Sequence, residues 1–231
     1  MITWRTLVAA LALAGGLALP ARGEAQDILA LTYEMVDREQ AGDDAAVVAL
    51  AERALGLAEE GSGAGGAAPA AYADYLGLAY LRVGRTEQAE RMLLRALADR
   101  ERLFGALHPA VALTLEHLAR VSRVAGRTDE ATERLRRALS MYEDLLGAQH
   151  PSVATPAFAL GLVSLDAGRY EESERLFLRA ETIRERVYGP RHPRVAHVLE
   201  AHARLLRETG RIDQARDIEA RIQNLHRAER P

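Results

Sequence analysis

The apolar positions of the chain recur with the spacing of an α-helix. A clear stretch runs through Leu135, Ala138, Leu139, Tyr142 and Leu145. These positions share one face of a helix, because a helix turns once in about 3.6 residues. Acidic residues precede the stretch and Gly147 follows it. Acidic side chains favour a helix N-terminus and glycine favours its end, so the pattern predicts one bounded amphipathic helix.

Two short landmarks recur along the chain with one common period. Gly-Arg pairs are spaced 42 residues apart and begin at Gly84, Gly126, Gly168 and Gly210, with a weaker copy at Gly42. A Gly-x-x-His-Pro phrase recurs between them with the same spacing and ends at Pro109, Pro151 and Pro193. Proline suits the first position of a helix, where its missing N–H breaks no hydrogen bond. Each period therefore predicts two helices joined by short turns.

Two segments depart from this period. Pro156 lies five residues after Pro151, where a helix interior would lose a hydrogen bond. We expect this helix to start late, with Thr155 as N-cap and Pro156 at its first position; a kinked helix is the alternative. The first repeat is degenerate, because Glu34 stands where later repeats have leucine. Residues 61–69 form a Gly/Ala-rich sequence that predicts a flexible linker.

The recurring residues resemble the tetratricopeptide repeat. Leu76-Gly77-x-x-Tyr80, followed by Ala89 and Ala96, matches its signature positions, and the 42-residue length with the phrase Gly-x-x-His-Pro-x-Val-Ala is similar to the kinesin-light-chain-like subclass. The resemblance implies an all-α fold, a right-handed α-solenoid of antiparallel helix pairs. About five repeats are expected, with a degenerate repeat over residues 26–60, the solenoid over 70–226 and a polar tail over 227–231.

The resemblance also implies a concave groove lined by the first helix of each pair. The groove positions are Asp74, Leu78, Leu81, Glu116, Arg120, Arg123, Phe158, Leu162, Leu165, Glu200, Arg204 and Arg207. Apolar residues exposed in a groove favour partner contact, so Phe158, Leu162 and Leu165 are candidate anchors, although ordinary core packing would equally explain them. The paired asparagines common in kinesin-light-chain-like grooves are absent from these positions.

The charged groove positions allow two interpretations. Glu116 with Arg120 and Glu200 with Arg204 are spaced i, i+4 in the favourable order. Each pair would therefore satisfy its own charge in solution, while the same residues would also serve to recognise a partner.

The N-terminus has the features of a secretory signal. Arg5 precedes an apolar segment of 13 residues, and Gly23-Glu24-Ala25 or Ala21-Arg22-Gly23 offers a small-x-small cleavage site. A membrane-spanning helix needs about 20 apolar residues. We expect residues 1–25 to be a signal peptide and the mature chain to be exported to a bacterial periplasm or beyond. An uncleaved membrane anchor is the alternative.

Composition and motif searches argue against catalysis. The chain has no cysteine, its 30 basic residues are all arginine, and its net charge is −3, which disfavours thiol chemistry and nucleic-acid binding. His108, His150 and His192 are one repeat apart, about 20 Å at about 10 Å per helix, too far to share one metal ion. His197, Glu200 and His202 do not match His-Glu-x-x-His. We therefore expect no cofactor, metal or enzymatic activity.

The leading hypothesis is a non-enzymatic, exported interaction module. It would act as an adaptor or assembly factor and hold a peptide or a partner's helix in its groove. We expect no nucleic-acid partner, and no membrane contact after signal cleavage. The alternatives are a self-associating structural repeat protein of the cell envelope and an accessory subunit of a separately encoded enzyme.

Overall fold

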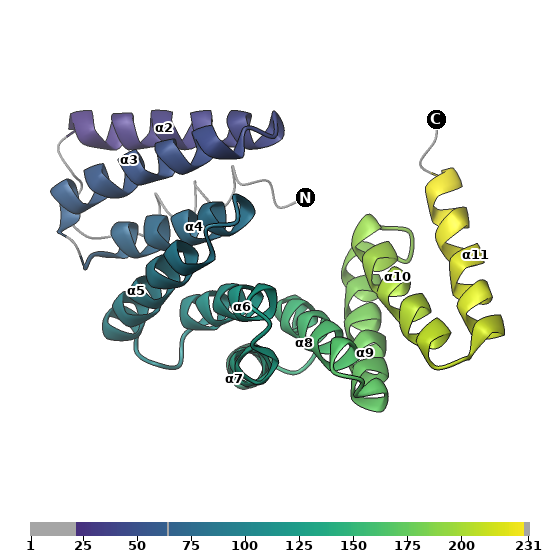
Figure 1. Ribbon diagram of the computed structural model, residues 1–231. Helices are drawn as coiled ribbons and strands as arrows, with labels where there is room; N and C mark the ends of the chain where they lie inside the picture. Colours follow the sequence, from purple (N-terminus) through teal and green to yellow (C-terminus); the bar gives the residue numbers. More distant parts are fainter. Residues whose placement is uncertain (1–21, 64, 229–231) are drawn as a thin grey trace. The chain divides into compact units, whose positions relative to one another are not determined.

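The computed structural model describes residues 22–63 and 65–228, and the regular elements in these ranges are all helical (Figure 1). They are α2 (Arg22–Gln40), α3 (Asp44–Ser62), α4 (Ala67–Arg82), α5 (Thr86–Phe104), α6 (Pro109–Val124), α7 (Thr128–Leu146), the 3₁₀ turn η1 (Pro151–Val153), α8 (Ala154–Asp166), α9 (Tyr170–Tyr188), α10 (Pro193–Glu208) and α11 (Ile212–Ala228). Across these ranges, none of the helices combines the length and apolar character needed to cross a membrane. The predicted all-α fold of paired helices is confirmed.

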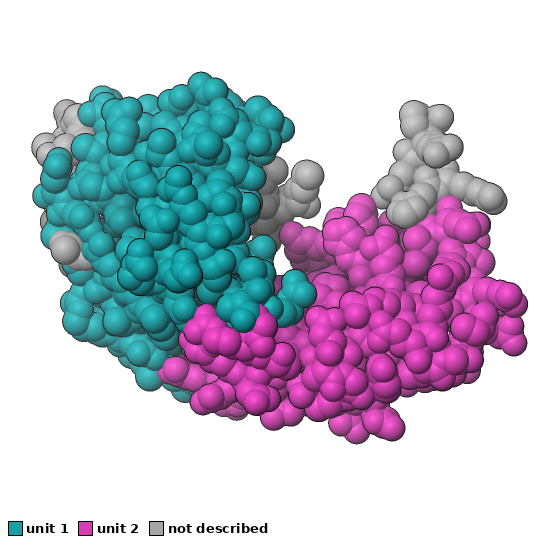
Figure 2. Space-filling view, in the orientation of Figure 1, with its two compact units in different colours: residues 1–125 teal, residues 126–231 magenta. Residues whose placement is uncertain are grey.

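The chain divides into two compact units, residues 1–125 and 126–231 (Figure 2). In the first, each of the helices α2 to α6 packs on the next, and α4 also contacts α6. In the second, α7 to α11 pack in the same consecutive manner, and α8 contacts α10. Leu76, Leu93 and Leu118 belong to the core of the first unit, while Val195, Leu199 and Ile222 form a cluster in the second.

The histidines of the His-Pro turns cap the helices that follow them. Nδ1 of His108 accepts a hydrogen bond of 3.1 Å from the backbone N–H of Ala110, and His192 accepts one of 3.1 Å from Arg194. His150 does the same at 3.2 Å from Ser152. A capping acceptor satisfies a backbone donor that the first turn leaves unpaired. These histidines therefore define helix starts.

The start of α8 differs from the prediction. Pro151 opens the short 3₁₀ turn η1, and α8 begins at Ala154, so Thr155 is not its N-cap and Pro156 is its third residue. The first four N–H groups of a helix have no partner within it, and a proline there removes no hydrogen bond. The helix does start late, but two residues earlier than expected.

The segment boundaries also differ from those expected. Only Gly63 to Gly66 separate α3 from α4, so helix extends into both ends of the predicted linker 61–69. Gly63 has a φ of +76°, which glycine adopts without a Cβ clash and which ends α3. At the other end of the chain, α11 continues to Ala228, past the predicted solenoid end at 226. Apart from residues 22–25 of α2, the predicted signal peptide lies outside the described residues.

Small residues let the paired helices approach closely. A Cβ on Gly161 would lie 2.7 Å from the ring of Phe177, and one on Gly77 would lie 2.6 Å from Cγ of Leu93. Real Cβ atoms do not approach this closely, so both sites require glycine unless the facing side chain moves. The recurring small residues Ala89, Ala131, Ser173 and Ala215 are buried.

Candidate functional site

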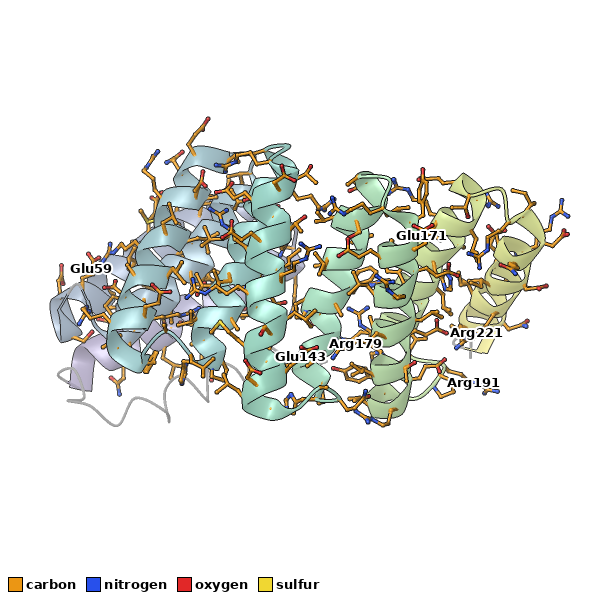
Figure 3. All side chains as sticks on the ribbon, turned by 90° about the horizontal axis from the view of Figure 1, so that it is seen from below. Glu59, Glu143, Glu171, Arg179, Arg191 and Arg221 are labelled. Atoms are coloured by element: carbon orange, nitrogen blue, oxygen red, sulfur yellow. The ribbon has the colours of Figure 1, made fainter. Side chains whose placement is uncertain are left out.

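Charges on the second helices are paired in a ladder that follows the repeat. Arg95 of α5 pairs with Glu59 of α3, and Arg179 of α9 pairs with Glu143 of α7. Arg221 of α11 pairs with Glu185 of α9 in the same relative position. Figure 3 shows Glu143 and Arg179 side by side on neighbouring helices. Because these charges satisfy one another, the ladder serves to join helices and leaves the first helices as the candidate binding surface.

The groove positions of α4 and α6 in the first unit include one arginine, Arg120, that has no acidic partner among the described residues. Leu78 and Leu81 of α4 are half-buried, and Arg120 and Arg123 of α6 are exposed. Arg82, at the end of α4, pairs with acidic residues of α2 and α3. Arg120 forms no hydrogen bond or ion pair with any residue in the described part of the chain, so its predicted pairing with the carboxylate one turn earlier does not form.

The electrostatics of Arg120 reflect this arrangement. Although the residue as a whole is exposed, partial desolvation of its guanidinium lowers its pKa below the ordinary arginine value, and the positive charges of Arg123 and then Arg82 lower it further. Repulsion between like charges is reduced when an anion binds among them. The groove positions Leu78, Leu81, Arg120 and Arg123 are here called the inner face of the first unit. They are apolar on α4 and positively charged on α6, and these two helices contact each other.

Two acidic groove positions lie inside this unit instead of on its surface. Asp74 is 5% exposed and Glu116 is also buried. Nη1 of Arg100 donates a hydrogen bond of 3.1 Å to Oδ1 of Asp74, and Nδ1 of His117 lies 2.8 Å from Oδ2. Burial alone would raise the pKa of Asp74, but the charge and hydrogen bond of His117, the charge of Arg100 and a hydrogen bond from Thr114 bring it below its usual value. Asp74 thus holds helices together.

The corresponding position two repeats later is Phe158. Its half-buried ring lies 5.8 Å from that of Phe177, and the guanidinium of Arg184 lies 4.7 Å from its centroid. Arg184 stands at the repeat position of Arg100. Arg184 donates a hydrogen bond to the backbone carbonyl of Arg194, and Arg100 donates one to that of Ala110. A cation–π contact therefore replaces the buried ion pair. Burial and then the charge of Arg194 lower the pKa of Arg184 to about 10, so it stays charged at neutral pH.

The other groove positions of the second unit differ in how far their side chains are buried. Leu162 is half-buried, and Leu165 is buried where α8 packs against its neighbours. Glu200, Arg204 and Arg207 of α10 are exposed. The predicted pairing of Glu200 with Arg204 does not form, because Arg204 donates to Glu208 at 2.8 Å and to Asp166 at 3.1 Å.

Sequence reasoning overlooked His202 as an unusual core residue. It stands where the preceding repeats have Leu76, Leu118 and Leu160, and it is 6% exposed. Neither ring nitrogen has a hydrogen-bond partner among the described residues, and Nε2 lies 3.6 Å from Oε1 of Glu174. A polar residue at a position that is otherwise leucine is the signal that would have found it.

The described residues hold no group of three His, Asp or Glu side chains arranged to bind a metal ion. Together, the paired helices and the repeated turns define a helical-repeat protein, whose first helices carry both apolar and charged residues at the groove positions. The tetratricopeptide repeat family model matches residues 67–144, 110–166 and 152–228, and the chain belongs to that family. No curated protein sequence matches it significantly.

Solved structures show the same fold. A kinesin light chain-like repeat protein from Podosopora anserina, described as putative, superposes with a TM-score of 0.71 at 19% identity, over 88% of this chain and 97% of the other. BtubC (BKLC) from P. vanneervenii gives 0.70 at 20% identity, over 83% and 76%. Aspartyl phosphate phosphatase F from Bacillus subtilis gives 0.72 at 13% identity, over 90% and 53%. The kinesin-light-chain-like resemblance of the sequence is confirmed at the level of fold.

Proposed function

We propose that the protein binds an acidic segment of another protein on the inner face of its first unit. The general role follows from the family, because tetratricopeptide repeats form protein–protein interaction modules. The observation that supports the finer role is Arg120, whose charge has no acidic partner within the described residues and is opposed by two neighbouring arginines. We propose no catalytic role.

The chemistry of this face favours a carboxylate. A guanidinium binds a carboxylate through two parallel hydrogen bonds, which are stronger than neutral ones. Leu78 and Leu81 lie on the contacting helix α4 and offer apolar contact to the same segment. The helices are already formed, so little of the binding free energy is lost in ordering this side of the complex.

A pair of labelled peptides tests this proposal. Fluorescence anisotropy would compare hexaglutamate with hexaglutamine on the purified protein. We expect hexaglutamate to bind more tightly and Arg120→Gln to weaken it about tenfold, as expected for one lost charge-assisted hydrogen bond. Arg53→Gln is the control, because Arg53 is exposed on α3, a helix that contributes no residue to the inner face. Equal affinities for the two peptides, or equal effects of the two variants, would contradict the proposal.

We also propose that the protein works after export. The support is the sequence of residues 1–25, and cleavage after Ala25 would remove only the first four residues of α2. Intact mass of the protein recovered from the periplasm or medium tests this, with a mature chain starting at Gln26 or Glu24 as the expected result. Full-length protein found in the membrane fraction would support the uncleaved anchor instead.

Self-association is a second candidate, favoured by one observation. Leu29 and Tyr33 are 40% and 49% exposed on α2. Two large apolar residues one helical turn apart form an exposed apolar patch, which favours association with another protein surface. Light scattering of the wild type and of Tyr33→Ser over a range of concentrations tests this role. A mass that rises with concentration only in the wild type supports it, and a constant monomer mass excludes it.

A further inference from the structure

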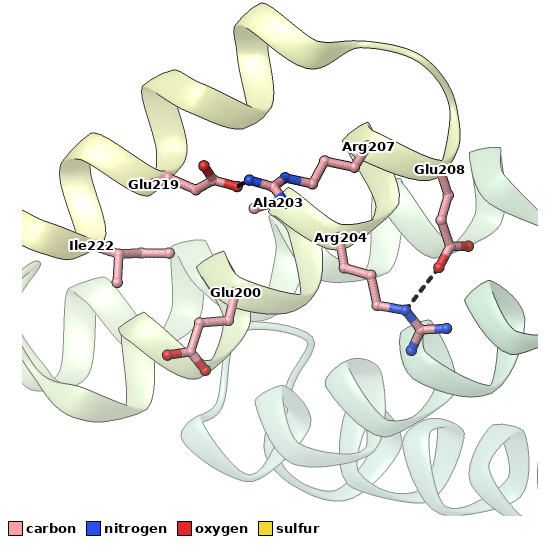
Figure 4. A pocket seen from close by; sticks show the side chains of 7 residues that line it. All are labelled: Glu200, Ala203, Arg204, Arg207, Glu208, Glu219 and Ile222. Carbon is pink, nitrogen blue, oxygen red and sulfur yellow. Dashed lines mark hydrogen bonds and ion pairs between the residues drawn. The ribbon is translucent and has the colours of Figure 1, made fainter.

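The second unit has an open hollow of about 340 Å³ between α10 and α11 (Figure 4). Ala203 and Ile222 supply its apolar lining, one from each helix. The other lining residues are charged, and most of them are engaged with one another. Arg207 pairs with Glu219 at 2.7 Å, and Arg204 pairs with Glu208 at 2.8 Å.

Glu200 differs from these charged residues. It is exposed and forms no ion pair or hydrogen bond with any residue that the structure describes. Figure 4 shows its carboxylate apart from both arginine pairs, at the end of the hollow near Ile222. Asp166 also lies within 3.1 Å of Arg204, so the charge of Arg204 has more than one acidic partner. The hollow therefore presents one uncompensated negative charge beside an apolar surface.

The repeat register explains why this surface is open. One repeat earlier, the corresponding residues Gly161, Leu165, Phe177 and Ala180 are all buried, in a unit where α10 packs against both α8 and α9. One repeat later, Arg207 stands in place of Leu165 and Glu219 in place of Phe177. A further apolar helix would have to bury these charges, which is costly. The hollow instead suits a ligand that combines a cation with an apolar stem.

We propose that this hollow binds an arginine side chain of a partner protein. The guanidinium would pair with Glu200, and the methylene groups would pack on Ala203 and Ile222. Arginine fits better than lysine because its planar fork makes two parallel hydrogen bonds to a carboxylate. The inference deepens the interaction role proposed above, but it concerns another surface and the opposite charge.

The probe for this site is N-acetyl-argininamide, titrated into isotope-labelled full-length protein and followed by backbone amide NMR shifts. N-acetyl-glutaminamide, which is neutral, is the matched control ligand. We expect saturable shifts over residues 200–222 with the arginine compound, and much smaller ones with the glutamine compound. Shifts of the same size with both compounds would overturn the proposal.

Two variants make the test specific. Glu200→Gln removes the unpaired carboxylate and should lower the affinity for N-acetyl-argininamide at least fivefold. The rest of the spectrum should show that the fold persists. Glu171→Gln removes an exposed carboxylate of α9 outside the hollow and should leave the affinity unchanged. Binding that survives Glu200→Gln would overturn the proposal. Because hexaglutamate binding concerns the first unit, loss of one activity with retention of the other separates the two proposals.

Discussion

Nδ1 of His117 lies 2.8 Å from Oδ2 of Asp74, although 43 residues separate them in the chain. The other carboxylate oxygen of Asp74 accepts a hydrogen bond of 3.1 Å from Arg100. This buried network joins α4, α5 and α6, and removing its single carboxylate would leave a buried guanidinium without its counter-charge.

Asp74 should make the stability of the first unit depend on pH. The pKa of Asp74 in the folded protein lies below its usual value. Its contribution is therefore complete above about pH 4 and is lost as the pH falls through the folded pKa. Urea unfolding should show Asp74→Asn to be less stable by about 3 kcal/mol at pH 7. The difference from the wild type should shrink at acidic pH; a constant difference down to pH 2.5 would contradict the network.

Phe158 and Arg184 should be energetically coupled. Their contact of 4.7 Å replaces an ion pair found two repeats earlier. In a double-mutant cycle with Phe158→Leu and Arg184→Met, we expect a coupling of about 1 kcal/mol in the free energy of unfolding. Strict additivity of the two substitutions would show that the ring and the guanidinium do not stabilise each other.

Replacing His202 should stabilise the protein. Both ring nitrogens are buried and have no hydrogen-bond partner in the part of the chain that the structure describes, and leucine occupies this position in the preceding repeats. His202→Leu should raise the free energy of unfolding by about 1–2 kcal/mol, because an unsatisfied buried polar group is costly. His197→Leu, an exposed change on the same helix, should shift it by no more than about 0.5 kcal/mol. A less stable His202→Leu would indicate that the imidazole has a favourable partner.

The charged pair Arg207–Glu219 should limit stacking at the end of the second unit. The corresponding Leu165 and Phe177 are buried one repeat earlier. The double variant Arg207→Leu/Glu219→Phe should therefore self-associate, seen as a mass by light scattering that rises with concentration. The control Arg216→Leu/Asp217→Phe makes similar changes at exposed positions of α11 outside the hollow. Equal association of the two variants would mean that the end face has no special role.

The repeat architecture could be predicted because its signals are local and periodic. Gly126 and Gly168 adopt positive φ at the ends of their helices, and Pro109 and Pro193 begin theirs. Each signal concerns only a few neighbouring residues and recurs in several repeats. A repeat with a weak signal can therefore be interpreted by comparison with the others. The start of α8 was harder to predict because the first turn of a helix tolerates proline, and both η1, with Pro151, and α8, with Pro156, have one there.

The depth of the inner residues could not be predicted in the same way. Register places Asp74 and Glu200 at equivalent positions, yet one is buried and the other exposed. The difference arises from residues far along the chain: Arg100 and His117 surround Asp74, whereas Glu200 lies beside α11. The burial of a side chain depends on its tertiary contacts, which a repeat pattern does not specify.

The most direct test of the proposed interaction role is to locate a bound acidic peptide. Hexaglutamate carrying a photoreactive group would be crosslinked to the wild-type protein, and the modified residues would be mapped by mass spectrometry. We predict crosslinks on α4 and α6 around Leu81 and Arg120, lost in Arg120→Gln. Crosslinks spread over exposed arginines such as Arg53 and Arg91, or unchanged in the variant, would contradict the account.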